Sequence, residues 1–400
     1  MNTLQQQNKW IGWNAEQVLM FPLVTLLSVV WVVNILLAKM QGSAVLKNSR
    51  HTTLSGHELV LRQFTHGILR NSFLLWEILN GRVSLVGMPM NTGRCLGVGA
   101  AAQPGLISLW QLRQLSGLSE AGLYDTVIRQ LRYSRVEQLQ LLIKFGVAKC
   151  LYQQANLHRP TCFQLFGMRI NNLSMDAAVA RITAEPMYDS ARVGYFVNVN
   201  SFNIAHSRPG FRALVNTADW VFADGSGVRL AAKHQGIALR DNVNGTDMLP
   251  KLCEQAQNQG LSLYLLGADE GVAAAAAAAL RTQFPGLRIA GTEHGYIDHN
   301  DSQAVIERIN AAGTDILLVG MGSPIQEQWL RDHAHRLHCR SALAVGGLFD
   351  FFSGRIPRAP LWMRELGLEW VWRLLQEPKA KFHRYVIGNP QFLFRMIKHS

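Results

Sequence analysis

No charged residue interrupts the chain between Val18 and Ala38. A run of about twenty apolar residues is long enough to cross the hydrocarbon core of a bilayer as a single helix. The run is too long for a cleavable signal peptide, which leaves a membrane segment or a buried helix of a soluble protein. The sequence favours the membrane segment. Pro22, near its start, leaves a re-entrant hairpin open as the alternative to a full crossing.

Positive charge is distributed unevenly around this run. The chain holds 39 Lys and Arg against 27 Asp and Glu, a net charge of +12. Only Lys9 precedes the run, whereas Lys39 and Lys47 follow it closely, so we expect its C-terminal side to lie in the cytoplasm. An anionic membrane surface is the expected partner of such a basic segment. A regulator that binds nucleic acid through its charge is the least favoured alternative, because no nucleic-acid-binding fold is recognisable.

Two stretches of the first half carry a first resemblance. They read LLWEILNGRVSLVGMPM (residues 74–90) and QPGLISLWQL (residues 103–112), and they resemble the bacterial sugar transferases, the polyprenyl-phosphate hexose-1-phosphate transferases. In that family an Asp-Glu pair just before the Leu-Trp carries the chemistry, but this chain reads RNSFLLW there. A covalent phosphosugar step needs a carboxylate nucleophile. Residues 1–150 are therefore interpreted as a degenerate, membrane-anchored relative.

The second half has a different pattern. A break at residues 151–163, punctuated by Pro160, is interpreted as a linker. Beyond it, short apolar runs alternate with segments of helical pattern. This order predicts an α/β fold, a doubly wound and mostly parallel sheet that binds ligands at the carboxyl ends of its strands. The expected strands are 195–199, 220–223, 262–266, 288–290, 316–319 and 342–345. The expected helices are 203–216, 226–235, 247–259, 270–283, 302–311 and 324–337.

Four of these strands end in glycine-rich turns. Glycine lets backbone N–H groups approach a ligand closely, and a helix that begins after the turn favours a phosphate at its N-terminus. A nucleotide or nucleotide-sugar site is therefore favoured at this edge. The chain has neither G-x-G-x-x-G nor G-x-x-x-x-G-K-[ST], which argues against a dinucleotide oxidoreductase or a P-loop ATPase. The turns are residues 224–227, 267–271, 320–324 and 346–347.

Four stretches hold these turns in a recognisable order. They are VNVNSFNIAHSRPGFRALVNTADWVFADGSGVRLAAKHQGIALRDNVNGTDMLP, VGMGSPIQEQWL, AVGGLFDFFSGRIPRAPLWMRELGLEWVWRLLQEP and RYVIGNPQF. From about residue 164 to its end, the chain resembles the WecG/TagA/CpsF family, glycosyltransferase family 26. The resemblance implies a Rossmann-like catalytic core of the GT-E type over residues 164–354 and a basic helical appendage over residues 355–400.

The resemblance also implies an activity. Members of the family are inverting, metal-independent enzymes at the bacterial cytoplasmic membrane. We therefore expect transfer of a sugar from a UDP donor to a polyprenyl-diphosphate-linked sugar, on the cytoplasmic face, in the synthesis of a surface polysaccharide. The sugar would be N-acetylmannosamine, its uronic acid or a related hexose, and a homo-oligomer stays open. The alternative is a non-catalytic membrane scaffold for polysaccharide-assembly enzymes, because both halves depart from their family patterns.

Residue roles follow from the same resemblance. Inverting transfer needs a base for the acceptor hydroxyl, and the family's Asp in D-G-x-G corresponds to Asp224, which could otherwise be an ordinary helix cap. The family's Thr in T-x-N-P-E is Asn198 here, and its Lys in K-Q-E is Ile325. The expected substrate-binding residues are Asn198, Asn200, Gly225, Thr246, Asp247, Gly267, Gly322, Gln326, Glu327 and Arg355.

No metal site is expected. No Asp-x-Asp motif stands at a strand end, since Asp298 and Asp301 have the wrong spacing and lie in a polar stretch. The five cysteines lie far apart and form no C-x-x-C pair. Without a cation, helix N-termini and fixed positive side chains must stabilise the departing diphosphate. The resemblance assigns this role to Arg373, together with Arg358 or Arg384.

Overall fold

The structure is a computed structural model that describes residues 15–66, 69–91, 103–116, 122–152, 158–185, 190–297 and 302–398. The chain divides into two compact units. Unit 1 consists of Met1–Gln114 and Ala121–Val147, and unit 2 consists of Leu115–Glu120 and Ala148–Ser400. Each unit has its own hydrophobic clusters.

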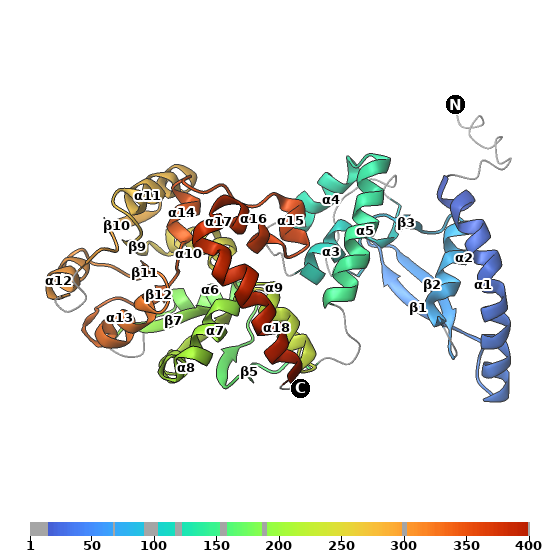
Figure 1. Cartoon of the computed structure of the whole chain (residues 1–400). Helices are drawn as coiled ribbons and strands as arrows, with labels where there is room; N and C mark the ends of the chain where they lie inside the picture. The colour runs from blue at the N-terminus through green and yellow to red at the C-terminus, as the bar shows by residue number, and fades with distance from the viewer. Residues whose placement is uncertain are drawn as a thin grey trace, which may run out of the picture. The chain divides into compact units, whose positions relative to one another are not determined.

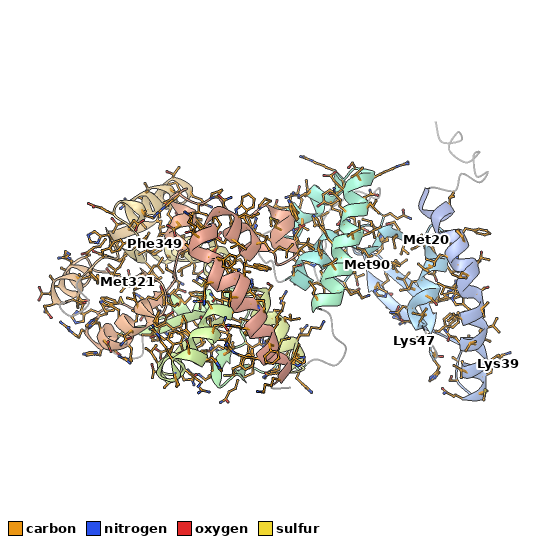
Figure 2. The ribbon with its side chains drawn as sticks, viewed as in Figure 1. Met20, Lys39, Lys47, Met90, Met321 and Phe349 are labelled. Carbon is orange, nitrogen blue, oxygen red and sulfur yellow. The ribbon has the colours of Figure 1, made fainter. Side chains whose placement is uncertain are left out.

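Unit 1 begins with a long apolar helix, α1 (Ala15–Met40). Of the described helices, α1 alone is long and apolar enough to cross a membrane, over Met20–Met40 with a mean hydropathy of 2.3. Most of its apolar side chains are exposed, and Leu26 and Val29 expose 73% and 69% of their surface. The helix continues through Pro22 and does not turn back there. Figure 2 shows Met20 and Lys39 toward opposite ends of this helix.

One aromatic cluster fixes α1 to the rest of unit 1. Trp31 donates a hydrogen bond from Nε1 to Ser72 Oγ at 2.9 Å, and its ring lies 5.3 Å from Phe73 and 6.0 Å from Phe64. Ser72 and Phe73 lie in the short helix η1 (Arg70–Phe73), which leads into α2 (Leu74–Leu79). In the resembled sugar transferases this stretch carries the acidic pair. Here its side chains hold the apolar helix.

A buried carboxylate organises the remainder of unit 1. Glu77 of α2 has no exposed surface and accepts from Arg62 Nε at 3.3 Å and from Arg82 NH1 at 2.8 Å. Arg62 lies on β2 (Glu58–Phe64), which pairs antiparallel with β1 (Leu46–Thr52). The other elements are β3 (Ser84–Val86), β4 (Gly105–Ile107), α4 (Leu123–Leu131), and most of α3 (Leu109–Ser116) and α5 (Arg135–Tyr152), whose last residues are assigned to unit 2.

Unit 2 is built on an eight-stranded sheet (Figure 1). The strand order is β10-β9-β11-β12-β7-β8-β6-β5, and all neighbours are parallel except β5 and β6. After β8 the chain crosses to β9 on the other half of the sheet, and it returns to place β12 beside β7. This reversal puts a crevice at the carboxyl ends of β7 and β12, where open α/β sheets bind ligands. The strands are β5 (Cys162–Leu165), β6 (Met168–Asn171), β7 (Arg192–Val197), β8 (Trp220–Ala223), β9 (Ser262–Gly267), β10 (Arg288–Glu293), β11 (Ile316–Gly320) and β12 (Ser341–Ala344).

Helices cover both faces of the sheet. Successive strand residues alternate between two hydrophobic layers, so that Tyr195 and Val197 join one layer and Phe196 joins the other. The first layer is covered by α7 (Val199–Ser207), α8 (Pro209–Asn216), α9 (Ser226–His234), α12 (Gln303–Ala311) and α13 (Ile325–His333). The second is covered by α6 (Met175–Thr183), α10 (Gly245–Gln259), α11 (Val272–Gln283) and α14 (Leu348–Phe352). Burial on both sides explains why the strands read as continuous apolar runs.

The predicted α/β architecture with a mostly parallel sheet is confirmed, with several local differences. The strand expected over 195–199 ends at Val197, because Asn198 caps α7. The helix expected over 203–216 is two helices, and the second begins at Pro209, whose fixed φ suits a first helical turn. The short strands β5 and β6 and the helix α6 were not anticipated.

The C-terminal segment forms a helical appendage on the core of unit 2. Its helices are α15 (Leu361–Glu365), α16 (Glu369–Gln376), α17 (Pro378–Phe382), the π-helical turn η3 (His383–Ile387) and α18 (Gly388–Lys398). Helix α18, red in Figure 1, packs against α7. Asn203 of α7 donates to Gly388 O at 2.9 Å and accepts from Arg395 at 2.6 Å. Phe392 is buried against Phe202, with their ring centroids 5.7 Å apart.

Candidate active site

A cavity of about 870 Å³ lies between the sheet edge of unit 2 and the appendage. Its core wall comes from the turns after β7, β8, β11 and β12, where Asp224, Gly322 and Gly346 line it. Met321, labelled in Figure 2, follows β11 and also lines it. Its other wall comes from the appendage, where Arg373 and Arg384 line it. The cavity therefore opens where the strand order reverses.

Glycines bring the strand ends together at the floor of this cavity. A Cβ on Gly267 would lie 2.4 Å from Gly320 O, and one on Gly320 would lie 2.7 Å from Gly346 O. Only residues without a Cβ allow backbones to approach so closely. Gly267 itself does not line the cavity, whereas Ala268 does. The residue expected to bind substrate thus has a packing role in this structure.

Asp224 follows β8 and lines the cavity. Its backbone N–H donates to Val197 O at 2.9 Å, and its Oδ2 accepts from Asn198 Nδ2 at 3.2 Å. Burial raises the pKa of Asp224 to about 6, and the negative charge of Glu369 adds to this rise. The Asn198 hydrogen bond and the positive Arg384 act in the opposite direction. A carboxylate with such a pKa can accept a proton near neutral pH.

The turn after Asp224 excludes the helix-cap interpretation for this residue. Helix α9 is preceded by Gly225 at φ +93°, and no side chain caps it. Gly225 donates its backbone N–H to Asn242 Oδ1 at 2.6 Å. The Asp224 carboxylate therefore stays directed by Asn198 and open to the cavity.

Asn198 combines a structural contact with a contact to Asp224. Its Oδ1 accepts from the backbone N–H of Asn200 at 3.1 Å, and its own backbone N–H donates to Ser201 Oγ at 3.2 Å. These bonds cap α7 and leave the side-chain amide free to hold Asp224. Asn200 also lines the cavity.

The Asn244–Asp247 turn anchors the appendage. Asn244 Oδ1 caps α10 by accepting from Asp247 N at 2.8 Å, and its amide donates to Asp247 Oδ2 at 2.7 Å. Asp247 is buried and forms an ion pair with Arg358. Thr246 and Asp247 line the main cavity, but Arg358 lines an adjoining cavity of about 360 Å³. The structure thus separates Arg358 from the other two predicted arginines.

Gln326 and Glu327 have different positions although they are adjacent in the chain. Gln326 lines the cavity and accepts from Gly346 N at 2.9 Å. Glu327 does not line it. Its Oε1 accepts from Ser323 Oγ at 2.6 Å and from Gln326 Nε2 at 3.0 Å, and burial raises its pKa. Glu327 therefore holds two neighbouring side chains and lies outside the cavity lining, and its predicted contact with substrate stays a prediction.

The appendage contributes a row of charges to the cavity. Arg373 NH2 lies 3.1 Å from Glu377 Oε2, and the Lys381 ammonium lies 3.6 Å from the same oxygen. The Arg373 guanidinium also lies 4.6 Å from the centre of the Phe351 ring. Arg384 lines the cavity with its guanidinium 5.2 Å from the Tyr385 ring centre. The predicted Arg373 and Arg384 therefore face the same cavity as Asp224.

Arg355 lies at the start of the appendage and lines the same cavity. It pairs with Asp269 and lies 3.6 Å from Asp350. Asp269 also accepts from the Tyr296 hydroxyl at 2.7 Å. Burial raises the pKa of Asp350.

Several lining residues were not anticipated from the sequence. Asn242, Asp350, Glu369 and Glu377 all line the cavity. The four-residue spacing of Arg373, Glu377 and Lys381 is a local signal that could have indicated an ion-pair row on one helical face. Asn242 has no such signal, because its contact with Gly225 exists only in the folded chain.

Within the described residues, no three His, Cys, Asp or Glu side chains converge as metal ligands. The predicted polar stretch with Asp298 and Asp301 lies outside those residues.

Comparisons with known proteins show which family this chain belongs to. The model of the glycosyl transferase WecG/TagA/CpsF family matches residues 163–400. The chain belongs to this family. It is also 32% identical over 196 residues to an N-acetylglucosaminyldiphosphoundecaprenol N-acetyl-beta-D-mannosaminyltransferase from Bacillus spizizenii, a match that covers 49% of this chain and 75% of the relative.

The family match confirms the resemblance predicted from residue 164 onward, and it makes the protein a glycosyltransferase. The matched segment contains the appendage, all of the sheet except Cys162, and all of the cavity lining except Ser116 and Leu151. It does not include residues 1–162, so the sugar-transferase resemblance of the first half stays a prediction.

The pKa of Asp224 leads to a prediction about stability. Because folding raises this pKa from 3.8 to about 6, the native state binds more protons than the unfolded state between these values, and stability falls as the pH rises through this window. Asp224→Asn removes this effect. At pH 7 we expect the variant to be more stable than the wild type by on the order of 1–2 kcal/mol, and the gain should vanish below pH 4. Urea unfolding at pH 4 and 7 measures the difference.

Asp332→Asn serves as the control, because Asp332 is an exposed aspartate that does not line the cavity. Its stability relative to wild type should be the same at both pH values. A gain for Asp224→Asn that is equally large at pH 4 and pH 7 would contradict the prediction.

Proposed function

We propose that this protein transfers a sugar from a UDP-sugar donor to a polyprenyl-diphosphate-linked sugar, with inversion and without a metal ion, in the synthesis of a bacterial surface polysaccharide. The name of the Bacillus spizizenii relative describes the transfer of N-acetylmannosamine to an acceptor of this chemical class. The observation that carries the proposal is the Asp224 carboxylate in a cavity that also contains cationic side chains of the appendage. The donor sugar would be N-acetylmannosamine, its uronic acid or a related hexose.

In the proposed reaction Asp224 is the general base. It accepts the proton of an acceptor hydroxyl while the hydroxyl oxygen bonds to the anomeric carbon of the donor. The bond from that carbon to the diphosphate oxygen breaks at the opposite face, and UDP leaves with the electron pair. Asn198 supports this role because its amide holds Asp224 Oδ2 at 3.2 Å and thereby fixes the carboxylate.

The leaving diphosphate would be stabilised by Arg373 and Arg384. Both line the cavity of Asp224, whereas Arg358 lines the adjoining cavity and is paired with Asp247. Fixed cations stabilise developing negative charge most strongly where water is excluded. The geometry therefore favours Arg384 over Arg358 as the partner of Arg373.

The donor pocket would be formed by the sheet edge. Asn200, Gly225, Thr246, Gly322 and Gln326 line the cavity there, and Arg355 lines it from the start of the appendage. The Gln326 side chain is held at both ends, by Gly346 N and by Glu327 Oε1. A side chain fixed in this way loses little entropy when it binds a ligand.

Helix α1 would anchor the enzyme to the cytoplasmic face of the inner membrane, where a polyprenyl acceptor is found. Its length, its apolar composition and the exposure of its side chains support this part of the proposal. Lys39 at the helix end and Lys47 at the start of β1 supply positive charge on the side expected to be cytoplasmic (Figure 2).

The decisive activity test replaces the proposed base. Asp224→Asn keeps the size of the side chain but removes its ability to accept a proton, and we expect kcat to fall by about 10²–10⁴-fold. Transfer of label from a UDP-sugar to a short polyprenyl-diphosphate acceptor measures this loss, and donor binding should be largely retained. Asp332→Asn, at an exposed site on α13, should match the wild type.

Two results would contradict the proposal. An active Asp224→Asn enzyme would remove Asp224 from its role. Absence of transfer by the wild-type protein across a panel of UDP-sugars and acceptors would instead favour a non-catalytic scaffold.

The metal-independent mechanism is tested separately. If fixed arginines neutralise the leaving diphosphate, EDTA should leave the initial rate unchanged within about twofold, and added Mn²⁺ or Mg²⁺ should not raise it. The rate is measured with the same labelled donor. Loss of activity in EDTA that Mn²⁺ restores would assign the role of Arg373 and Arg384 to a metal ion.

The membrane anchor is tested on exposed positions of α1. Leu26→Lys combined with Val29→Lys places two charges on the apolar surface of the helix, where each charge costs about 2.5–3.5 kcal/mol at the centre of a bilayer. We expect the protein to move from the membrane fraction to the soluble fraction. Leu26→Ile combined with Val29→Leu is the control and should stay with the membrane. Retention of the double-lysine variant in the membrane after a salt wash would contradict the proposal.

A further inference from the structure

A second carboxylate from the appendage reaches the cavity that contains Asp224. Glu369 is the first residue of α16 and lines this cavity. One third of its side chain is exposed, but its Oε1 is buried and accepts no hydrogen bond from any described residue. Glu369 is therefore a charged group in the site for which the proposed reaction has given no role.

A hydrogen bond between the core and the appendage joins the turns that carry the two carboxylates. Ser226 Oγ donates to Gly367 O at 2.9 Å. Ser226 lies two residues after Asp224, and Gly367 lies two residues before Glu369. Gly367 has a φ of +70° in the turn between α15 and α16, a conformation that glycine adopts readily. The turn that follows Asp224 and the turn that precedes Glu369 are thus joined by a hydrogen bond.

Two features place positive charge near the Glu369 carboxylate. Its Oε1 lies 3.8 Å from Arg358 Nε, and a guanidinium at this distance stabilises a carboxylate. Glu369 also lies in the first turn of α16, an eight-residue helix, where the helix dipole favours negative charge. Asp224 has no such cationic partner among the described ion pairs.

We propose that Glu369 is a positioning residue for the transfer reaction, through which the docked appendage supplies a negative charge that strengthens Asp224 as a base. The inference rests on the proposed role of Asp224. It gives the appendage a second task besides stabilisation of the diphosphate, because the base would reach its full strength only when α16 is in place.

The energetics of the proton transfer support this role. When the acceptor hydroxyl loses its proton to Asp224, the repulsion between Asp224 and Glu369 is relieved as the new glycosidic bond forms and UDP departs. Burial is the largest cause of the raised pKa of Asp224, and the negative charge of Glu369 raises it further.

Other charged groups face the same cavity. Arg384 of η3 acts on Asp224 in the opposite direction to Glu369 and lowers its pKa. The remaining charged groups that line the cavity are Arg229 of α9, Asp247 of α10, Asp269 after β9, Asp350 of α14, Arg355, Arg364 of α15, Arg373 of α16, and Glu377 and Lys381 in and beside α17. The charges that shift the pKa of Asp224 are those of Glu369 and Arg384, and none of these other groups is among them.

The test is the pH dependence of kcat/KM, which reports the ionisation of the free enzyme's base. Glu369→Gln keeps the shape of the side chain and removes its charge. The acid limb of the profile lies near pH 6 in the wild type. We expect it to move to lower pH by about half a pH unit to one pH unit in Glu369→Gln. Glu369→Asp, which keeps the charge, should move it less. Glu377→Gln is the matched control, because it neutralises another cavity-lining glutamate of the appendage and should leave the acid limb in place.

An acid limb that stays in place or moves up in Glu369→Gln would overturn the inference. If that variant is too slow for a full profile, the carbon-13 resonance of the Asp224 carboxyl group, assigned by its absence from Asp224→Asn, gives the same titration in the folded protein. The two proposals fail differently. An active Asp224→Asn enzyme would remove the proposed base, whereas an inactive Asp224→Asn together with an unmoved limb in Glu369→Gln would remove only the role of Glu369.

Discussion

The ion pair between Asp247 and Arg358 is the contact on which the site depends. Asp247 is buried in the first turn of α10, and Arg364 approaches it to 3.9 Å from a second appendage position. Removal of one partner from a buried pair leaves an uncompensated charge and typically costs about 3–5 kcal/mol. This pair holds the start of the appendage on the sheet edge. The same appendage carries Arg373, Arg384 and Glu369 to the cavity wall.

The cavity itself combines charges of both signs. Arg373 and Lys381 share Glu377, and Arg355 lies between Asp269 and Asp350. Cations gathered in a partly buried space repel one another, and the carboxylates between them offset this repulsion. A bound diphosphate would bring negative charge to the same cations. The carboxylates therefore keep the arginines in place while the ligand is absent.

Several features of the sequence translate directly into structure. The continuous apolar runs at 220–223 and 316–319 are central strands, because both of their faces are buried by helices. Asp224 was found from its place after such a strand together with the family motif. Other elements escaped prediction. Strands β5 and β6 have four residues each and pair with each other at one side of the sheet, so their pattern is too short to distinguish them from loops.

The sequence by itself determined the apolar helix, the α/β order, the glycine-rich strand ends and the position of Asp224, because each is encoded in a local pattern of hydropathy, spacing or backbone freedom. Only the tertiary structure decided which charged residues share a cavity. It put Arg358 and Arg384 in different cavities, buried Glu327 outside the cavity that Gln326 lines, and placed Glu369 in the same cavity as Asp224. These relations join residues far apart in the chain, and they depend on how the appendage docks, which no local pattern specifies.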